Sequence, residues 1–256
     1  MAPVIRAASH PATNKTIFDL LIMEDIRSKR VLDIGAGRGY LSSRIGEYLV
    51  QHNLDPRDIL TACDLFPQYF EYQGVTCQKV DAIDRLPFAD NAFDIVYAVE
   101  VLEHLQNPYA FIDDVCRIVK PGGKILLSVP NILNLSSRIS YFLHGFHELF
   151  EPLSFKDEDA GRLCGHIMPL NYFYIEHGLR NAGFSNTFIH SDKLKKSNII
   201  IYYLFSWLFK ATSGRFIRNI TRKNPYLAEI NRHSLAAMNS KTLLCSRSCI
   251  ITATKP

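Results

Sequence analysis

Short apolar runs alternate with segments of helical periodicity over the first half of the chain. The runs predict strands at 31–37, 59–65, 75–82, 93–99 and 124–130. Apolar residues at helical spacing predict helices at 16–26, 40–50 and 108–119. Near-continuous apolar strands that alternate with helices are typical of a parallel sheet covered on both faces. We therefore expect an α/β fold with a doubly wound, mostly parallel sheet.

The pattern changes after Pro130. Residues 131–170 mix aromatic, histidine and acidic side chains, and we expect them to form a lid or acceptor region over a site. A helix at 169–184 and strands at 185–192 and 243–254 then complete a seven-stranded sheet. Residues 195–240 stand before the last strand as an apolar, then basic, helical insertion. The main domain thus comprises residues 1–194 and 241–256.

Composition narrows the class of protein. The chain has 256 residues, of which 47% are apolar and 21% charged, which is typical of a folded globular protein. The net charge of +4 is too small to indicate nucleic-acid binding. The six cysteines form no C-x-x-C pair, so we expect buried thiols in a reducing compartment. We find no secretory signal and no apolar run long enough to span a membrane, and we expect a cytoplasmic location.

The first predicted strand ends in a glycine-rich loop. Glycines at 35, 37 and 39 let the backbone turn sharply and let a ligand lie against it. The spacing is G-x-G-x-G, whereas a dinucleotide loop has the spacing G-x-G-x-x-G. Asp33, two residues before the first glycine, would repel a pyrophosphate and attract a cationic, amino-acid-bearing ligand. The loop therefore favours a nucleoside ligand that is not a dinucleotide.

Two further carboxylates follow the next strands. Asp64 ends the second strand, where a carboxylate can accept hydrogen bonds from ribose hydroxyls. Asp81 ends the third strand and could accept from an adenine amine, with Ala82 and Ile83 beside the ring. Any one of these acids alone would be explained as a turn former or helix cap. Together with Asp33 they lie at one predicted sheet edge and indicate a nucleoside site.

These residues carry a family resemblance. The runs VLDIGAGRGYLS, CDL, VDAIDRLPFADNAFDIVYAVEVLEHLQNP and VKPGGKILLSVPN closely resemble class I S-adenosylmethionine-dependent methyltransferases over about residues 20–130. The resemblance implies the Rossmann-like methyltransferase fold and S-adenosylmethionine as cofactor. It implies that Asp33, Gly35 and Gly37 surround the methionine part, that Asp64 binds ribose and that Asp81 binds adenine. The full set of expected cofactor residues is Asp33, Gly35, Ala36, Gly37, Gly39, Tyr40, Asp64, Leu65, Asp81, Ala82, Val99 and Glu100.

A second motif, E-x-x-E-H, follows the fourth strand. Glu100, Glu103 and His104 share one face if a helical turn begins there. They could bind a divalent cation, or His104 could act as a general base. The motif resembles ubiquinone-biosynthesis-type O-methyltransferases. It also resembles small-RNA 2′-O-methyltransferases, in which a later histidine completes a magnesium site, and His166 has a similar offset here. The candidate Mg²⁺ ligands are therefore Glu100, Glu103, His104 and His166. The candidate catalytic residues are Glu103, His104 and His166.

The acceptor is less well defined. The segment 198–223 places an apolar aromatic run before spaced cations, and could lie in a membrane interface or be a buried helix or dimer contact. It loosely resembles the tails of methyltransferases from surface-polysaccharide gene clusters, where lipid-linked sugars are among the acceptors. A peripheral contact with the inner membrane face is one expectation, nucleic acid is disfavoured, and the oligomeric state is open.

We therefore expect an enzyme that moves a methyl group from S-adenosylmethionine to oxygen of a small-molecule or glycan-type acceptor. The alternatives are an RNA 2′-O-methyltransferase with the four-residue magnesium site, and a cofactor-binding but non-catalytic partner subunit. A nicotinamide-dependent oxidoreductase is disfavoured by the glycine spacing and by Asp33.

Overall fold

The strands form one sheet of seven in the order β3-β2-β1-β4-β5-β7-β6. The computed structural model describes residues 5–81, 85–153 and 165–256. β1 pairs in parallel with both β2 and β4, whereas β7 is antiparallel to β5 and β6. The strands are β1 (Val31–Ile34), β2 (Leu60–Asp64), β3 (Cys77–Lys79), β4 (Phe93–Val99), β5 (Val119–Pro130), β6 (Ser185–Ser191) and β7 (Ser248–Thr254). The doubly wound, mostly parallel, seven-stranded sheet is confirmed.

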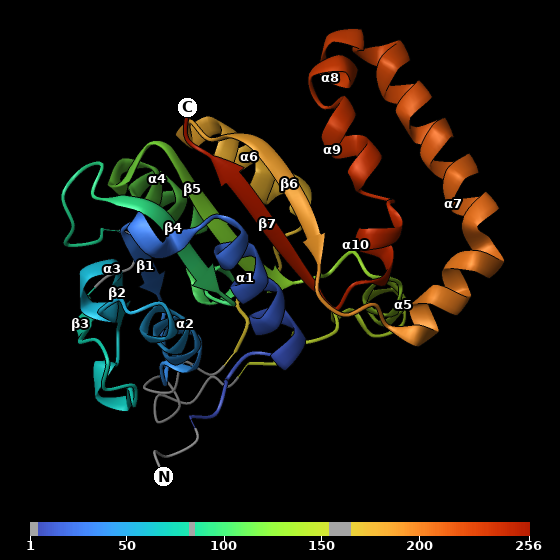
Figure 1. Ribbon diagram of the computed structural model, residues 1–256. Helices are drawn as coiled ribbons and strands as arrows, with labels where there is room; N and C mark the ends of the chain where they lie inside the picture. Colours follow the sequence, from blue (N-terminus) through green and yellow to red (C-terminus); the bar gives the residue numbers. More distant parts are fainter. Residues whose placement is uncertain (1–4, 82–84, 154–164) are drawn as a thin grey trace.

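Helices cover both faces of this sheet (Figure 1). The α-helices are α1 (Pro11–Met23), α2 (Tyr40–Gln51), α3 (Pro56–Ile59), α4 (Pro108–Ile118), α5 (Leu135–His144), α6 (Tyr172–Ala182), α7 (Lys196–Lys223), α8 (Pro225–Ile230), α9 (Arg232–Ala237) and α10 (Lys241–Cys245). The described residues also form three short 3-10 helices, η1 (Ile26–Ser28), η2 (Pro67–Tyr69) and η3 (Leu102–His104).

Side-chain alternation along the strands divides the apolar core into two layers. Val31 and Ile95 face α1 and α2, whereas their neighbours Leu32 and Val96 face the layer that holds α4 and α6. All four side chains are buried. Because both faces are covered there, the central strands β1 and β4 are apolar at most successive positions, which explains their continuous runs in the sequence.

The ends of several elements differ from the sequence-based expectation. The expected strand at 243–254 begins only at Ser248, because α10 precedes it and is capped by the Ser240 hydroxyl, which accepts from the Leu243 amide at 3.2 Å. β5 begins at Val119 and contains the expected turn, with Gly122 at φ +78°. Helix α1 begins at Pro11, five residues earlier than expected.

The described cysteines carry free thiols, as expected. Cys63, Cys116, Cys245 and Cys249 are buried and Cys77 is half-buried. Cys164 lies outside the described residues.

The expected insertion is helical and consists of α7, α8 and α9, with α10 leading into β7. Figure 1 shows α7 farthest from the sheet, with α8 and α9 running back toward it. In the part of the chain that the structure describes, no helix combines the length and hydropathy needed to cross a membrane.

A buried amide attaches α7 to α5. Asn198 is fully buried, and its side-chain oxygen accepts from the Ser136 amide at 3.2 Å and from the Ser136 hydroxyl at 2.5 Å. Its side-chain amide donates to the Asn134 side-chain oxygen at 3.3 Å. Because these groups are shielded from water, their hydrogen bonds fix where α7 begins relative to α5.

We expect Asn198→Ala to lower the free energy of unfolding by about 1–3 kcal/mol, because Ser136 and Asn134 lose buried partners. Ser197→Ala, at an exposed neighbouring position, is the matched control. Urea denaturation measures both variants. Equal stability of the two variants would contradict the assigned role of Asn198.

Candidate active site

The glycine-rich loop between β1 and α2 is held in left-handed backbone conformations. Gly35 and Gly37 have φ +71° and +53°. A Cβ on Gly35 would approach Val101 Cγ2 to 2.6 Å, whereas a Cβ on Gly37 would meet no atom within 4 Å. The loop therefore needs glycine at 35 for packing, and at 37 it borders open space where a ligand can approach the backbone.

Asp64, at the end of β2, fixes this loop. Its Oδ2 accepts from the Gly37 amide and its Oδ1 from the Phe66 amide, each at 2.8 Å. The amides of Gly35 and Ala36 donate to the Cys63 carbonyl at 2.9 and 3.1 Å. The loop is thus anchored to the end of the neighbouring strand through its own backbone amides.

Asp33 is buried behind the loop, with 4% of its surface exposed. Burial raises the pKa of its carboxyl to about 6, while the Ser42 hydroxyl, which donates to Oδ2 at 2.6 Å, opposes that rise. A cationic ligand group would stabilise the ionised form, which the apolar surroundings alone disfavour.

A cavity of about 240 Å³ opens at this edge. It lies at the carboxyl ends of β1 and β4, where the connections of a doubly wound sheet diverge and ligands bind. The expected cofactor residues that line it are Asp33, Gly35, Ala36, Gly37, Tyr40, Val99 and Glu100.

Four expected cofactor residues that the structure describes, Gly39, Asp64, Leu65 and Asp81, do not line this cavity. Gly39 packs its backbone against Phe70, with φ +81°. Asp64 binds the loop, and Leu65 packs partly buried against the core. Asp81 is exposed and pairs with Lys79 at 3.2 Å between Nζ and Oδ1. Ala82 lies outside the described residues.

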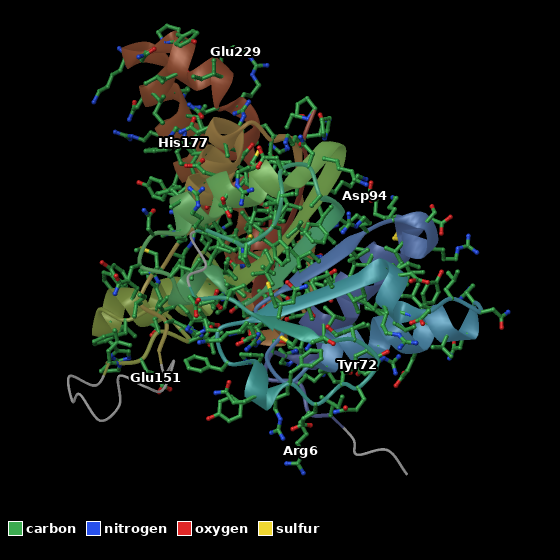
Figure 2. The ribbon with its side chains drawn as sticks, turned by 90° about the vertical axis from the view of Figure 1, so that its left-hand side faces the viewer. Arg6, Tyr72, Asp94, Glu151, His177 and Glu229 are labelled. Carbon is green, nitrogen blue, oxygen red and sulfur yellow. The ribbon has the colours of Figure 1, made fainter. Side chains whose placement is uncertain are left out.

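The N-terminal segment also lines the cavity, which the sequence pattern did not predict. Arg6 and Ser9 contribute from the chain before α1, and Asn14 from its first turn. Figure 2 shows Arg6 at the end of the molecule that also carries Tyr72, opposite the end that carries Glu229. No motif marks this segment, because its place depends on packing that the local sequence does not encode.

Glu100 follows β4 with φ +55°, a left-handed conformation that is rare for a residue with a side chain. Its amide donates to the Ser128 carbonyl at 3.0 Å. Its carboxylate pairs with Arg247, with 3.1 Å between Glu100 Oε1 and Arg247 Nη1. Arg247, just before β7, was not foreseen because it reaches this site only through the return of the last strand.

Glu103 carries a buried carboxyl group. Only 1% of its surface is exposed, and neither carboxylate oxygen has a hydrogen-bond partner among the described residues. Burial raises the pKa of Glu103 to about 8, so the carboxyl is largely protonated at neutral pH.

Residues 165–168 bring His166 beside His104 and Glu103. The amides of Ile167 and Met168 donate to the Glu103 carbonyl at 2.8 and 3.0 Å. The rings of His104 and His166 lie 5.0 Å apart between centroids, and both line the cavity. His166 Nε2 is 3.9 Å from Glu103 Oε1.

Both imidazoles are oriented by backbone carbonyls. His104 Nδ1 is 3.0 Å from the Gly165 carbonyl, and His166 Nδ1 is 2.5 Å from the Leu149 carbonyl. A carbonyl only accepts, so each Nδ1 carries the proton and each Nε2 is the lone-pair nitrogen of the neutral ring. Burial lowers the pKa of His104. The site therefore offers the Nε2 of His104 to a ligand as a neutral ring nitrogen.

Glu103, His104 and His166 each place a potential metal-ligand atom within 4.8 Å of the others. Glu100, the fourth expected ligand, does not join them, because its carboxylate faces Arg247. Two imidazole nitrogens and one carboxylate suit Zn²⁺ and other first-row transition metals, whereas Mg²⁺ prefers oxygen ligands. The donor set thus fits a transition metal better than the expected magnesium.

Comparison with known proteins agrees with the site. Residues 11–187 match a family described as a methyltransferase domain. A methyltransferase from Archaeoglobus fulgidus, described as SAM-dependent, superposes with a TM-score of 0.54 over 94% of each chain at 16% identity. A second such structure, from Mesorhizobium loti, gives a TM-score of 0.53 over 96% of this chain and 99% of that one at 12% identity. The chain belongs to the class I S-adenosylmethionine-dependent methyltransferases, a family whose cofactor is S-adenosylmethionine.

Curated relatives match a smaller part. The chloroplastic tocopherol O-methyltransferase of Arabidopsis thaliana is 32% identical over 118 residues, which are 44% of this chain and 34% of that protein. A ubiquinone biosynthesis O-methyltransferase of Xanthomonas oryzae is 33% identical over 116 residues, which are 42% of this chain and 45% of that protein. The chain therefore spans less than half the length of these relatives.

We expect Gly37→Ala to weaken binding of S-adenosylhomocysteine at least ~10-fold, because the added Cβ enters the open space beside the loop and φ +53° is strained for alanine. Gly122→Ala is the matched control, because Gly122 has φ +78° and equally open surroundings but lies away from the cavity. Calorimetric titration measures both. Equal loss of affinity would mean that strain alone, and not the ligand, explains the effect.

The raised pKa of Glu103 predicts a pH-dependent stability. The folded state holds this proton more tightly than the unfolded state, so the buried carboxyl increasingly destabilises the protein as pH rises from 4.5 to about 8. Relative to wild type, Glu103→Gln should gain up to ~1.4 kcal/mol of stability per pH unit in that window and level off above it. Urea denaturation at a series of pH values measures the difference. A difference that does not change with pH would contradict the buried, protonated carboxyl.

Proposed function

We propose that the enzyme methylates a hydroxyl oxygen of a small-molecule acceptor, with His104 or His166 as general base. One observation carries this proposal. Two imidazoles oriented by backbone carbonyls line the same cavity as the glycine-rich loop. The O-methyltransferase names of the two curated relatives are consistent with it.

The need for a base follows from the acceptor. When bound, S-adenosylmethionine supplies an activated methyl group and a neutral thioether leaving group. A hydroxyl is a poor nucleophile near neutral pH, so removal of its proton as the new C–O bond forms speeds the reaction. A neutral imidazole Nε2 can take this proton, and the lowered pKa of His104 keeps its ring in the base form. Alignment of acceptor and methyl group supplies the rest.

Glu103 would act as a positioning residue in this scheme. Its carbonyl holds the amides of Ile167 and Met168, which keeps His166 beside His104. Its protonated carboxyl adds no negative charge beside His104, so it does not drive that ring into the imidazolium form. Both effects keep a free base at the cavity.

We assign the cofactor within the same proposal. Asp33, Gly35 and Gly37 would surround its methionine part, where the cavity is lined by the loop. Asp64 and Asp81 would bind the ribose and the adenine, which requires Asp64 to accept ribose hydroxyls while it still holds the Gly37 amide. Residues 131–153 and 165–170 would flank the acceptor.

A metal-assisted reaction is the second candidate, favoured by the cluster of Glu103, His104 and His166. A bound cation would lower the pKa of an acceptor hydroxyl and would stabilise the ionised Glu103. This is the chemistry of the RNA 2′-O-methyltransferase alternative, with three ligands in place of the expected four. The cations of α7 lie beside exposed aromatic and aliphatic residues, which is not the arrangement of an RNA groove.

The base assignment predicts that His104→Gln or His166→Gln, whichever removes the base, lowers kcat 10²–10⁴-fold. Affinity for S-adenosylhomocysteine should change only severalfold. Release of S-adenosylhomocysteine from phenol, catechol and aniline as probe acceptors measures turnover, with kcat followed against pH. We expect turnover with the hydroxyl probes and, with His104 as the base, an acidic limb on which kcat rises with pH, centred below pH 6.5, because burial lowers the pKa of His104.

Methylation of aniline alone would contradict oxygen as the acceptor. Tight cofactor binding without turnover on any probe would favour the non-catalytic partner subunit.

Chelation separates the two candidates. A base without metal predicts that EDTA leaves wild-type kcat unchanged. Metal assistance predicts loss of activity, with recovery on adding Zn²⁺, Mn²⁺ or Mg²⁺, and no such recovery in Glu103→Ala.

A further inference from the structure

A stripe of apolar side chains runs along the solvent side of α7. Ile200, Tyr203, Leu204, Trp207 and Leu208 have the spacing i, i+3, i+4, i+7 and i+8, which places them on one face of a helix. Between 40% and 66% of each side chain is exposed. The inner face of α7 packs elsewhere, whereas this stripe faces solvent, apart from the Tyr203 hydroxyl, which accepts from Lys241 Nζ at 2.8 Å.

The same stripe continues as a row of cations. Arg215, Arg218 and Arg222 lie 15, 18 and 22 residues after Ile200, so they continue its face toward the end of the helix. α7 contains no Asp or Glu. None of these arginines forms an ion pair with a carboxylate in the described part of the chain.

Helix α5 extends the apolar stripe at the other end. It contacts the start of α7 through Ser136 and Asn198. Its exposed side chains include Phe142, at 87% exposure, together with Leu143 and Ile139. We call the apolar stripe of α7, its three arginines and the exposed apolar residues of α5 the docking face.

We propose that the docking face binds an anionic lipid membrane at its interface. An exposed apolar surface of this extent marks an interaction site. A tryptophan and aliphatic side chains beside a row of arginines fit the headgroup boundary, where the apolar groups enter the acyl region and the cations meet lipid phosphates. Helix α7 does not combine the length and hydropathy needed to cross the bilayer, so it would lie along the surface.

A second copy of this chain fits the docking face less well. Parallel pairing of two α7 helices would bring arginine against arginine, and antiparallel pairing would bury arginine against apolar side chains. Since α7 supplies no carboxylate, neither arrangement neutralises the cations. An anionic membrane satisfies both halves of the stripe at once.

The docking face is also connected through the chain to the candidate active site. The turn after α5 leads to Leu149, whose carbonyl orients His166. Membrane binding does not require methyl transfer, so its test is independent of the proposed function.

The single tryptophan of the chain reports on this face directly. Vesicles of phosphatidylcholine mixed with phosphatidylglycerol should shift the Trp207 emission to the blue and carry the protein upward in flotation. Vesicles of phosphatidylcholine alone should do so much more weakly, and high salt should reverse the binding.

Two sets of variants locate the contact. The triple variant Arg215→Gln/Arg218→Gln/Arg222→Gln removes the three cations of the docking face. It should bind anionic vesicles about 5-fold more weakly for each arginine lost, hence on the order of 100-fold more weakly in total. The matched control removes three exposed arginines elsewhere, in Arg27→Gln/Arg44→Gln/Arg57→Gln. The double variant Leu204→Ser/Leu208→Ser tests the apolar contact. Its matched control is Met23→Ser/Phe188→Ser, because Met23 and Phe188 are exposed apolar residues outside the docking face. Cofactor affinity of every variant should equal that of wild type.

Unchanged Trp207 emission and no flotation with anionic vesicles would overturn the proposal. So would equal loss of binding in the control variants. A blue shift that depends on protein concentration without vesicles, together with a dimer in sedimentation, would instead assign the docking face to a second copy.

Discussion

The parallel pairing of β1 with both β2 and β4 is the constraint on which the site depends. It brings the carboxyl ends of three adjacent strands to one edge, and the connection after each must leave that edge toward a helix layer. Gly35 and Gly37 make the first of these turns, and Asp64 holds it through the Gly37 amide. The cavity exists because these connections diverge there.

The chemistry of the site depends on the buried carboxyl of Glu103 at this edge of the sheet. Glu103 has no partner for its carboxylate oxygens among the described residues, so the carboxyl holds its proton near neutral pH. Its backbone carbonyl instead binds residues 167 and 168, which brings His166 beside His104. Two oriented imidazoles thus face the cavity that the glycine loop lines. A cofactor site and a candidate base site share one space for this reason.

The sequence predicted what local pattern encodes. Strand patterns along the chain predicted all seven strands, and the glycine spacing with Asp33 favoured a nucleoside ligand that is not a dinucleotide. It missed what long-range packing decides. Arg247 reaches Glu100 only because β7 returns beside β5, and residues 6–9 meet the cavity only because α1 packs on the sheet. Asp81 lies at the predicted strand end, but its side chain is exposed and pairs with Lys79, so its contact with adenine stays a prediction.

The central claim is that this edge of the sheet binds S-adenosylmethionine. Calorimetric titration of the wild-type protein with S-adenosylhomocysteine and, separately, with NAD tests it most directly, because both ligands carry adenosine and only one carries a pyrophosphate. The account predicts binding of S-adenosylhomocysteine at one site per chain and no heat from NAD. Binding of NAD without binding of S-adenosylhomocysteine would contradict it.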